Sequence, residues 1–365
     1  MKIVEVDTIP LAIPFTHGGR PAGWGGQAWT SLSILLVKVT TETGITGYGE
    51  AFSYGCLRAV QAAVEDMVAP IVIGQEFDDI GAFVTQLQQK LHLFGRYGIT
   101  MFALSGLDIA LWDIAARTDE LPLWQLLGRK QRNRLPAYAS LYRYAEPEIV
   151  AKRCSQAIAQ GYGWIKLHET EDREVAAARQ AVGEDFPIML DTNCPWTEAE
   201  AHERVASLRQ YGLYWLEEPI FPPENFKALA TLQATCNIPI AAGENACTAF
   251  EFEKMFEAKA VRYAQPSVTK LGGITEFRKV ASRCSAAGVH LMPHSPYFGP
   301  GFLATLHLAA LEPKDCMIER FYLSLEASLY GDWIEPTRGA FDLPRGPGLG
   351  LLPDPDVIRE YRVGP

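Results

Sequence analysis

The 365-residue chain is 48% hydrophobic and 21% charged, a composition typical of folded globular domains and unlike that of disordered segments. Its formal net charge of −10 and isoelectric point near 5.3 argue against nucleic acid or an anionic membrane surface as the main partner. A small acidic ligand remains compatible with this charge, because a metal ion and a few lysines can set the field inside one pocket.

The cysteines and the N-terminal segment indicate a protein of the cytoplasm. Seven cysteines are scattered along the chain without a Cys-x-x-Cys pair, so neither a disulfide framework nor a zinc site is expected. The first residues, MKIVEVDTIPLAIPF, lack the basic and apolar regions of a signal peptide. We also expect no apolar run close to the roughly 20 residues that a membrane span needs.

The first part of the chain predicts strands followed by helices. Strands are expected over Lys2–Ile13 and over Ser31–Glu50, the second as a hairpin with its turn at Thr41–Gly44. The segment between them, THGGRPAGWGGQAW, is rich in glycine and aromatic residues and predicts a lid over a pocket. Helical periodicity runs from Leu57 to Arg117. We therefore predict an α+β domain over residues 1–125.

After Arg134 the pattern alternates between strand and helix, which predicts a barrel over residues 126–330. The fold class is α/β, with eight expected strands at Leu135–Leu141, Trp164–His168, Pro187–Asp191, Tyr214–Glu217, Pro239–Gly243, Ala260–Gln265, His290–Pro293 and Cys316–Phe321. The Gly/Pro-rich segment 331–365 is expected to leave the barrel and to pack against the N-terminal domain.

Three of these strands carry an acid at or near the carboxyl end. The runs FPIMLDTN, LYWLEEPI and IPIAAGEN place Asp191, Glu217 and Glu244 about one strand–helix unit apart. The carboxyl ends of barrel strands meet at one mouth, where three facing carboxylates repel one another unless a cation neutralises them. An all-oxygen site of this kind favours Mg²⁺. Glu218 follows Glu217 directly, so it should point away from the mouth.

Other polar side chains are expected at the same rim. Lys166 and His168 are two residues apart on one strand, so they share a face, and each should lower the other's basicity. His294 ends the seventh strand and Glu319 lies on the eighth, although either is equally compatible with a structural role. Asn193 can reach the metal or substrate, or it can be a simple turn residue.

In this combination the motifs resemble the enolase superfamily, and specifically its mandelate racemase subgroup. The resemblance rests on ALSGLDIALWDIAAR, the Lys-x-basic strand, LDTN, EEP, GEN, TKLGGIT, PHSP and ERF, in this order. It implies a modified (β/α)7β TIM barrel under an α+β capping domain. It makes Asp191, Glu217 and Glu244 the Mg²⁺ ligands, and it assigns Glu218 to the outside.

The chain departs from the family pattern at two positions. His168 stands where the family usually has a second lysine, which is the base, and Ser267 stands where an aspartate usually pairs with the seventh-strand histidine. A serine cannot stabilise an imidazolium by charge, so His294 should be a weaker base than its family counterpart. The register of Lys270 differs from that of the family's sixth-strand base, so we assign it no role.

The resemblance implies abstraction of the proton α to a carboxylate, with the resulting enediolate stabilised by Mg²⁺. Lys166 or His168 would be the base, and Glu319 would donate a hydrogen bond to the substrate carboxylate. A weakly basic His294 is suited to protonating a leaving hydroxyl. The expected activity is therefore dehydration of a sugar acid to a 2-keto-3-deoxy acid.

The substrate is expected to be a small polyhydroxylated carboxylate. Its predicted contacts are Trp24 and Tyr54 of the capping domain, together with Ser140 and Asn193. The alternatives are a racemase, epimerase or lactone cycloisomerase, a metal-free glycoside hydrolase, and a non-catalytic barrel that keeps its metal site. We expect no nucleic-acid or membrane partner, and we expect a homo-oligomer.

Overall fold

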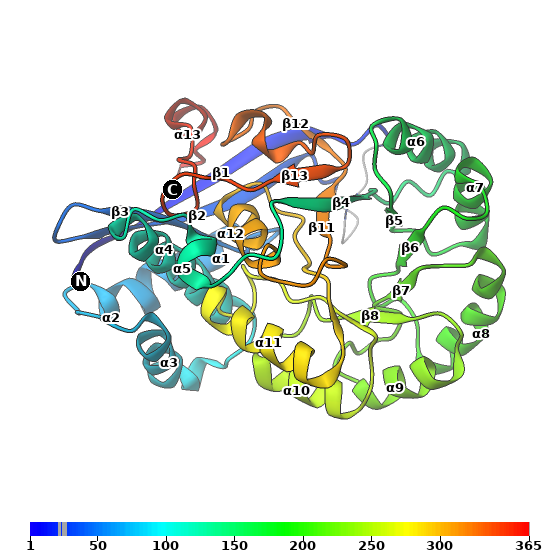
Figure 1. Ribbon diagram of the computed structural model, residues 1–365, viewed down its shortest axis with the longest axis horizontal. Helices are drawn as coiled ribbons and strands as arrows, with labels where there is room; N and C mark the ends of the chain where they lie inside the picture. Colours follow the sequence, from blue (N-terminus) through cyan, green and yellow to red (C-terminus); the bar gives the residue numbers. More distant parts are fainter. Residues whose placement is uncertain (21–22, 24–27, 365) are drawn as a thin grey trace.

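A computed structural model describes residues 1–20, 23 and 28–364. Its N-terminal part contains an antiparallel sheet in the order β12-β1-β2-β3, which lies beside a barrel of parallel strands (Figure 1). The sheet strands are β1 (Ile3–Thr16), β2 (Ser31–Thr41) and β3 (Thr46–Ala51). The predicted hairpin is confirmed, since β2 pairs with β3 in antiparallel register and Gly44 turns the chain with a φ of +82°.

The helices of the N-terminal domain pack against one face of this sheet. They are α1 (Leu57–Ala62), the π-helical turn η2 (Ala63–Val68), α2 (Ala69–Val72), α3 (Ile80–Lys90), the 3₁₀ turn η3 (His92–Phe94), α4 (Gly98–Thr118) and α5 (Leu123–Leu127). Close approach of α4 to β3 depends on Gly49, because a Cβ atom there would lie 1.9 Å from the Gly106 carbonyl oxygen.

The expectation that no apolar run approaches the length of a membrane span was wrong. Helix α4 has 21 residues and a mean hydropathy of 1.5 in its most apolar window, so by length and composition alone it could cross a membrane. However, 78% of that window is buried inside the protein. Its apolar residues therefore belong to the core that α4 forms with the sheet.

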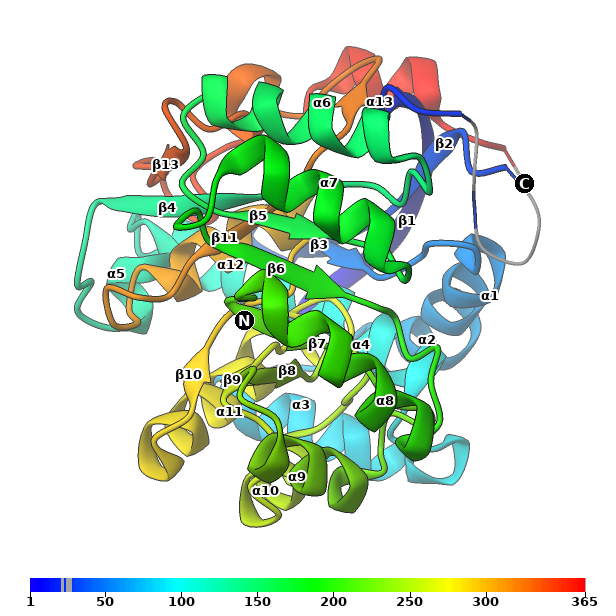
Figure 2. The same cartoon turned by 90° about the vertical axis from the view of Figure 1, so that its right-hand side faces the viewer.

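The barrel alternates strand and helix in the predicted (β/α)7β pattern (Figures 1 and 2). Its strands are β4 (Arg134–Ser140), β5 (Ile165–Leu167), β6 (Ile188–Asp191), β7 (Trp215–Glu217), β8 (Ile240–Ala242), β9 (Tyr263–Ala264), β10 (His290–Leu291) and β11 (Ile318–Phe321). The parallel pairing follows the order β10-β9-β8-β7-β6-β5-β4-β11. The intervening helices are α6 (Pro147–Ala159), α7 (Asp172–Val182), α8 (Glu198–Leu208), which η4 (Arg209–Tyr211) extends, α9 (Phe226–Thr235), α10 (Ala249–Glu257), α11 (Gly273–Ala287) and α12 (Pro300–Ala309).

Most barrel strands are shorter than predicted, and several expected strand-end residues lie just beyond them. His168 follows β5, and Glu244 lies two residues after β8. At β8 the reason is local, because Gly243 has a φ of +135° that no regular strand adopts. Below the mouth the interior is filled by a separate cluster that includes Tyr138, Met189 and Trp215, so the barrel is closed beneath the polar residues.

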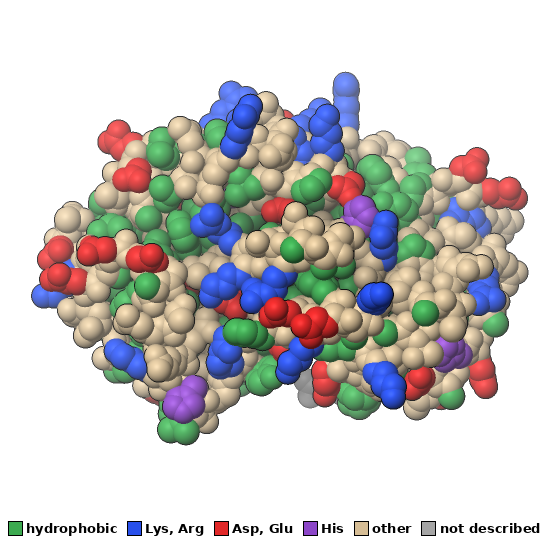
Figure 3. All heavy atoms as spheres, turned by 60° about the horizontal axis from the view of Figure 1, so that its bottom comes forward, with side chains coloured by type: hydrophobic (Ala, Val, Ile, Leu, Met, Phe, Trp, Pro, Cys, Tyr) green, Lys and Arg blue, Asp and Glu red, His purple; other side chains and the backbone are tan. Residues whose placement is uncertain are grey.

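The C-terminal segment runs back along the N-terminal sheet. After β12 (Ser324–Leu325) and η5 (Gly331–Ile334), β13 (Ala340–Asp342) pairs antiparallel with β4, and α13 (Pro355–Tyr361) contacts β1. The Val363 amide donates to the Pro10 carbonyl at 3.0 Å. Acidic and basic side chains are interspersed on the face shown in Figure 3, in agreement with the absence of a strongly basic composition.

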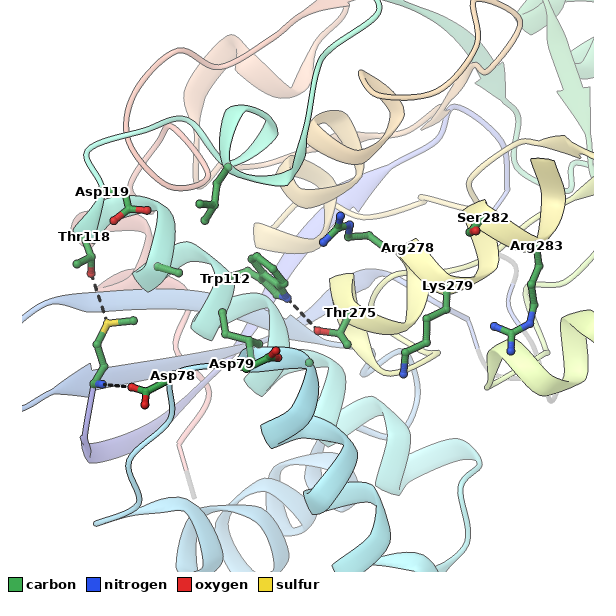
Figure 4. A pocket seen from close by; sticks show the side chains of 15 residues that line it. Asp78, Asp79, Trp112, Thr118, Asp119, Thr275, Arg278, Lys279, Ser282 and Arg283 are labelled. Carbon is green, nitrogen blue, oxygen red and sulfur yellow. Dashed lines mark hydrogen bonds and ion pairs between the residues drawn. The ribbon is translucent and has the colours of Figure 1, made fainter. Parts of the chain in front are cut away.

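Buried carboxylates of the N-terminal domain hold the first turns of two barrel helices. Glu50 accepts a hydrogen bond from the Gly301 amide at 2.8 Å at the start of α12, and Asp108 accepts one from the Thr275 amide at 3.0 Å in α11. Trp112 also donates its indole N–H to the Thr275 hydroxyl at 2.9 Å, at the side of a surface groove of about 890 Å³ between α4 and α11 (Figure 4). Carboxylates at helix N-termini are electrostatically favourable, so these contacts fix the capping domain on the barrel.

The contact of Glu50 with α12 can be tested through the pH dependence of stability. Burial raises the pKa of its carboxyl to about 8, against the lowering effect of the Gly301 and Gly299 amides. Between pH 4.5 and about pH 8 the Glu50 carboxyl keeps its proton only in the folded state. The stability that this proton contributes is therefore fully present below pH 4.5 and is lost as the pH rises through 8. Glu50→Gln should therefore gain stability relative to wild type between pH 5 and pH 8.5, as measured by urea unfolding. The same change at the exposed Glu360 should show no such trend, and a parallel trend in both variants would contradict the assignment.

Candidate active site

Asp191, Glu217 and Glu244 converge at the carboxyl ends of neighbouring strands. Each offers a carboxylate oxygen, and the three oxygens lie within 4.8 Å of one another. Asp191 and Glu217 occupy the same register on β6 and β7, and Glu244 reaches the group from the turn after Gly243. The three side chains that the sequence spacing places at one mouth are therefore brought together.

Lys166 lies at the centre of the acidic residues and is fully buried. Its Nζ atom lies 2.8 Å from Glu217 Oε1, 2.9 Å from Glu319 Oε1 and 3.4 Å from Asp191 Oδ2. Burial acts to lower the pKa of Lys166, but Glu217, Glu319 and the other neighbouring groups outweigh it and raise the pKa well above its usual range. The prediction that His168 and Lys166 hold down each other's charge was therefore wrong for Lys166, since carboxylates are its nearest partners.

His168 presents one ring nitrogen to the same group. Its Nδ1 atom contacts the Leu141 carbonyl, which requires Nδ1 to be the donor, and its Nε2 atom lies 3.2 Å from Asp191 Oδ2. Nε2 is therefore the atom that faces the mouth. Lys166 and His168 thus reach the same carboxylate oxygen from one strand end, as expected for side chains on one face.

His294 reaches the carboxylates from the turn after β10. Its Nε2 atom lies 2.9 Å from Glu244 Oε2, and its Nδ1 atom lies 3.1 Å from the Ser267 hydroxyl oxygen. The Tyr297 hydroxyl contacts the same serine oxygen, so the imidazole is backed by two neutral hydroxyl groups. The sequence predicts the replacement of a charged partner by Ser267, and the structure places the two residues in contact.

Glu319 and Ser140 lie on the side of the site formed by β11 and β4. Glu319 Oε1 accepts hydrogen bonds from Ser140 Oγ at 2.7 Å and from Lys166, and Oε2 accepts one from the Ser295 amide at 2.9 Å. Burial alone would raise the pKa of Glu319, but Lys166 and His294 lower it. Glu319 is thus an ionised acceptor here, whereas the predicted donor role needs a proton. Ser140, expected to contact substrate, is engaged with Glu319.

Glu218 does not join the three converging carboxylates, as expected from its place directly after Glu217. A φ of +49° turns its side chain into a buried position beside the mouth. There its carboxylate accepts hydrogen bonds from the Gly243 amide and the Asn245 side chain, both at 3.1 Å, and from Cys194. It remains separate from the three converging oxygens and supports the turn that carries Glu244.

Asn193 and Arg143 support Asp191 from outside the mouth. The Asn193 amide and side-chain nitrogens both donate to Asp191 Oδ1, at 2.9 and 3.0 Å. Arg143 donates to Asn193 Oδ1 at 3.1 Å and to the His168 carbonyl at 2.6 Å. The sequence analysis did not name Arg143. Its position just after the first barrel strand could have placed it at the mouth, because the carboxyl ends of barrel strands meet there.

Aromatic residues of the capping domain lie beside the mouth. Trp29 lies 5.3 Å from the Tyr54 ring and 6.0 Å from the Phe321 ring, and the Tyr54 hydroxyl donates to the Pro296 carbonyl. His17 stacks on Tyr142 at 4.0 Å. Trp24, predicted to contact substrate, lies outside the described residues. Trp29 lies in the segment predicted to cover a pocket and Phe321 in the ERF motif, but neither was named as a substrate contact.

The carboxylate group fits a hard divalent cation. Asp191 Oδ2 is buried without a hydrogen-bond partner in the described part of the chain, although Lys166 and His168 approach it as ion pairs. Three carboxylate oxygens form the kind of donor set that Mg²⁺ prefers. The fold and the site together define a barrel of the enolase type, with its acids on the sixth to eighth strands of the chain.

Comparison with known proteins assigns the chain more specifically. Residues 150–357 match the family described as enolase C-terminal domain-like, and residues 20–128 match the N-terminal domain of mandelate racemase and muconate lactonizing enzyme. The chain belongs to the mandelate racemase/muconate lactonizing enzyme family of the enolase superfamily, as the sequence motifs predict.

Relatives of several activities share this architecture. Arabinonate dehydratase of Saccharolobus solfataricus is 31% identical over 347 residues, covering 92% of each chain. D-Galactonate dehydratase of Klebsiella pneumoniae is 32% identical over 75% of this chain and 74% of that protein. A racemase from Streptomyces coelicolor, solved with bound magnesium, has a TM-score of 0.86 at 27% identity and covers 99% of this chain and 100% of its own.

The charge balance around Lys166 makes a testable prediction. Lys166→Met leaves Asp191, Glu217 and Glu319 without their shared cation, which should cost about 3–5 kcal/mol of unfolding free energy at pH 8. The loss should be measured by urea unfolding in EDTA, and Mg²⁺ should restore more stability to the variant than it adds to wild type. Lys152→Met, at an exposed position, should cost much less. Equal losses in the two variants would contradict the central role of Lys166.

Proposed function

We propose that this protein is a Mg²⁺-dependent dehydratase of sugar acids. The reaction removes the proton α to the substrate carboxylate and expels the β-hydroxyl group as water, leaving a 2-keto-3-deoxy acid. One observation carries the proposal: Lys166 and His168 at the end of β5, and His294, whose Nδ1 atom contacts the Ser267 hydroxyl, flank the same three carboxylates. Relatives named as arabinonate and D-galactonate dehydratases support the substrate class.

Asp191, Glu217 and Glu244 would hold the ion. When bound, Mg²⁺ supplies positive charge that polarises the substrate carboxylate and favours loss of its α-proton. The same charge offsets the carboxylates that keep Lys166 protonated. The remaining tasks, which are removing and returning protons and holding the substrate, belong to side chains of this chain.

Lys166 and His168 are the candidates for the base. Lys166 Nζ and His168 Nε2 both border Asp191 Oδ2, so each lies next to the position that a substrate carboxylate would occupy at the metal site. The base takes the α-proton, and the electron pair of the broken C–H bond moves toward the substrate carboxylate. Position favours His168 and intrinsic basicity favours Lys166.

His294 is the proposed acid. Strands β6, β7, β8 and β9 lie between β5 and β10 in the barrel order, so His294 approaches the site from the other flank. Its Nδ1 atom contacts the Ser267 hydroxyl, so Nε2, which lies 2.9 Å from Glu244 Oε2, is the ring atom that faces the carboxylate group and can deliver a proton there. The proton passes to the leaving β-hydroxyl, the C–O bond breaks, and the resulting enol becomes the 2-keto acid.

An isomerisation is the second candidate. D-Galactarolactone cycloisomerase of Agrobacterium fabrum is 29% identical over 350 residues, with 90% of this chain and 91% of that protein covered. Such a reaction can begin with the same α-proton step, so the products decide between the two. Conversion of a hydroxy acid to a stereoisomer or an opened lactone, without a keto product, would exclude the dehydratase.

The metal requirement can be tested on the carboxylates themselves. EDTA should abolish formation of the keto acid, and Mg²⁺ should restore it. Glu217→Gln should weaken Mg²⁺ binding by about tenfold or more, as measured by calorimetry, because it removes one of three anionic ligands. Glu224→Gln, outside this group, is the matched control. Undiminished formation of the keto acid in EDTA would contradict the Mg²⁺ requirement, and EDTA-resistant hydrolysis of a glycoside would favour a metal-free hydrolase.

Variants of the proposed acid and of the proposed bases should lose different steps of the reaction. His294→Asn should lower formation of the keto acid by about a hundredfold or more, because the leaving hydroxyl loses its acid. Exchange of the substrate α-hydrogen in D₂O, followed by NMR, should persist in this variant. Lys166→Met and His168→Asn should each abolish exchange if that residue is the base, and unchanged exchange would remove the residue from the role.

A further inference from the structure

Lys270 is a buried cation without an anionic partner in the described part of the chain. Only 7% of the residue is exposed, yet among residues 1–20, 23 and 28–364 no carboxylate lies within ion-pair distance of its ammonium group and no acceptor hydrogen-bonds to it. Its Nζ atom lies over the face of the Phe52 ring, at 5.0 Å from the centroid. A lysine with so little exposed surface and no carboxylate beside it is uncommon, and its ammonium group can still donate to an anionic ligand.

The backbone around Lys270 is held in place by both domains. Its amide donates to the Ser267 carbonyl at 2.9 Å, and the Phe52 amide donates to the Thr269 carbonyl at 3.2 Å. The Gly272 amide then donates to the Ser105 hydroxyl at 2.8 Å. The ammonium group is therefore positioned at the junction of the barrel loop and the capping domain.

This junction borders the site described above. Lys270 follows Ser267 by three residues, and the Ser267 hydroxyl contacts His294, which reaches Glu244; the Phe52 ring also lies 6.5 Å from the ring of Tyr297, which contacts the same serine. On the other side, the Phe52 ring lies 5.1 Å from the ring of Tyr54, which is one of the predicted substrate contacts. Lys270 thus lies between the carboxylates and the aromatic residues of the capping domain.

We propose that Lys270 binds a second carboxylate of the substrate, and hence that this enzyme prefers sugar diacids to monoacids. The inference rests on the proposed function, in which the first carboxylate is held at the metal site. A second carboxylate at the far end of a sugar chain would supply the anion that Lys270 lacks. A terminal hydroxymethyl group would leave the ammonium without a partner, so the discrimination arises from one buried charge.

Galactarate and D-galactonate, which differ at C6, are the substrates for the test. In wild type, kcat/KM for galactarate should exceed that for D-galactonate. Lys270→Met should lower kcat/KM for galactarate by about tenfold or more, mainly through KM, and change that for D-galactonate by less than about threefold. Lys270→Arg should keep most of the preference. A proportional loss for both acids would overturn the inference, because it would indicate a general role in folding or in binding the first carboxylate.

A binding measurement separates this inference from the reaction. Adipate and hexanoate have six carbons, differ by one carboxylate and carry no hydroxyl group to eliminate. Calorimetry with the Mg²⁺-loaded protein should show tighter binding of adipate to wild type and loss of that difference in Lys270→Met, with equal melting temperatures confirming the fold. Equal binding of both acids to wild type, or a preference that survives in Lys270→Met, overturns the role of Lys270. Failure of wild type to form a keto product from any sugar acid overturns the proposed function instead.

Discussion

The active site depends on the balance between buried carboxylates and the cations among them. Asp191, Glu217, Glu244 and Glu319 bring four formal negative charges into one barrel mouth, and Lys166 is the fully buried cation that contacts three of them. Such a group is stable only when positive charge offsets it. The need for a further cation follows from the same balance, and the three converging oxygens show where it fits.

Buried carboxyl groups also connect the capping domain to the barrel. Glu50 and Asp108 accept hydrogen bonds at the N-termini of α12 and α11, so buried carboxyl groups that take no part in the chemistry align the two domains. The alignment places Phe52 and Tyr54 next to the loop that carries Lys270. The end of β3 and the loop that follows it therefore have two tasks. They attach the capping domain to the barrel, and they border the proposed binding position for the far end of the substrate.

Prediction from the sequence succeeded where spacing alone determines position. The strand–helix repeat predicts the (β/α)7β order, and one acid per repeat places Asp191, Glu217 and Glu244 together. It failed where a single backbone angle or a distant partner intervenes. Strand β8 ends early because Gly243 has a positive φ, Glu319 accepts hydrogen bonds because Lys166 lies beside it, and α4 is a core helix despite its membrane-like composition.

The sequence by itself determined the barrel, the family and the three converging acids, because these follow from periodicity and from motifs within short segments. Only the tertiary structure decided the partners of each charge. Lys166 is surrounded by acids from β6, β7 and β11, His294 is backed by Ser267 and Tyr297, and Lys270 lies over the Phe52 ring with no carboxylate beside it among the residues that the structure describes. These contacts join residues far apart in the chain, and the pKa of a buried group depends on such neighbours rather than on its own segment.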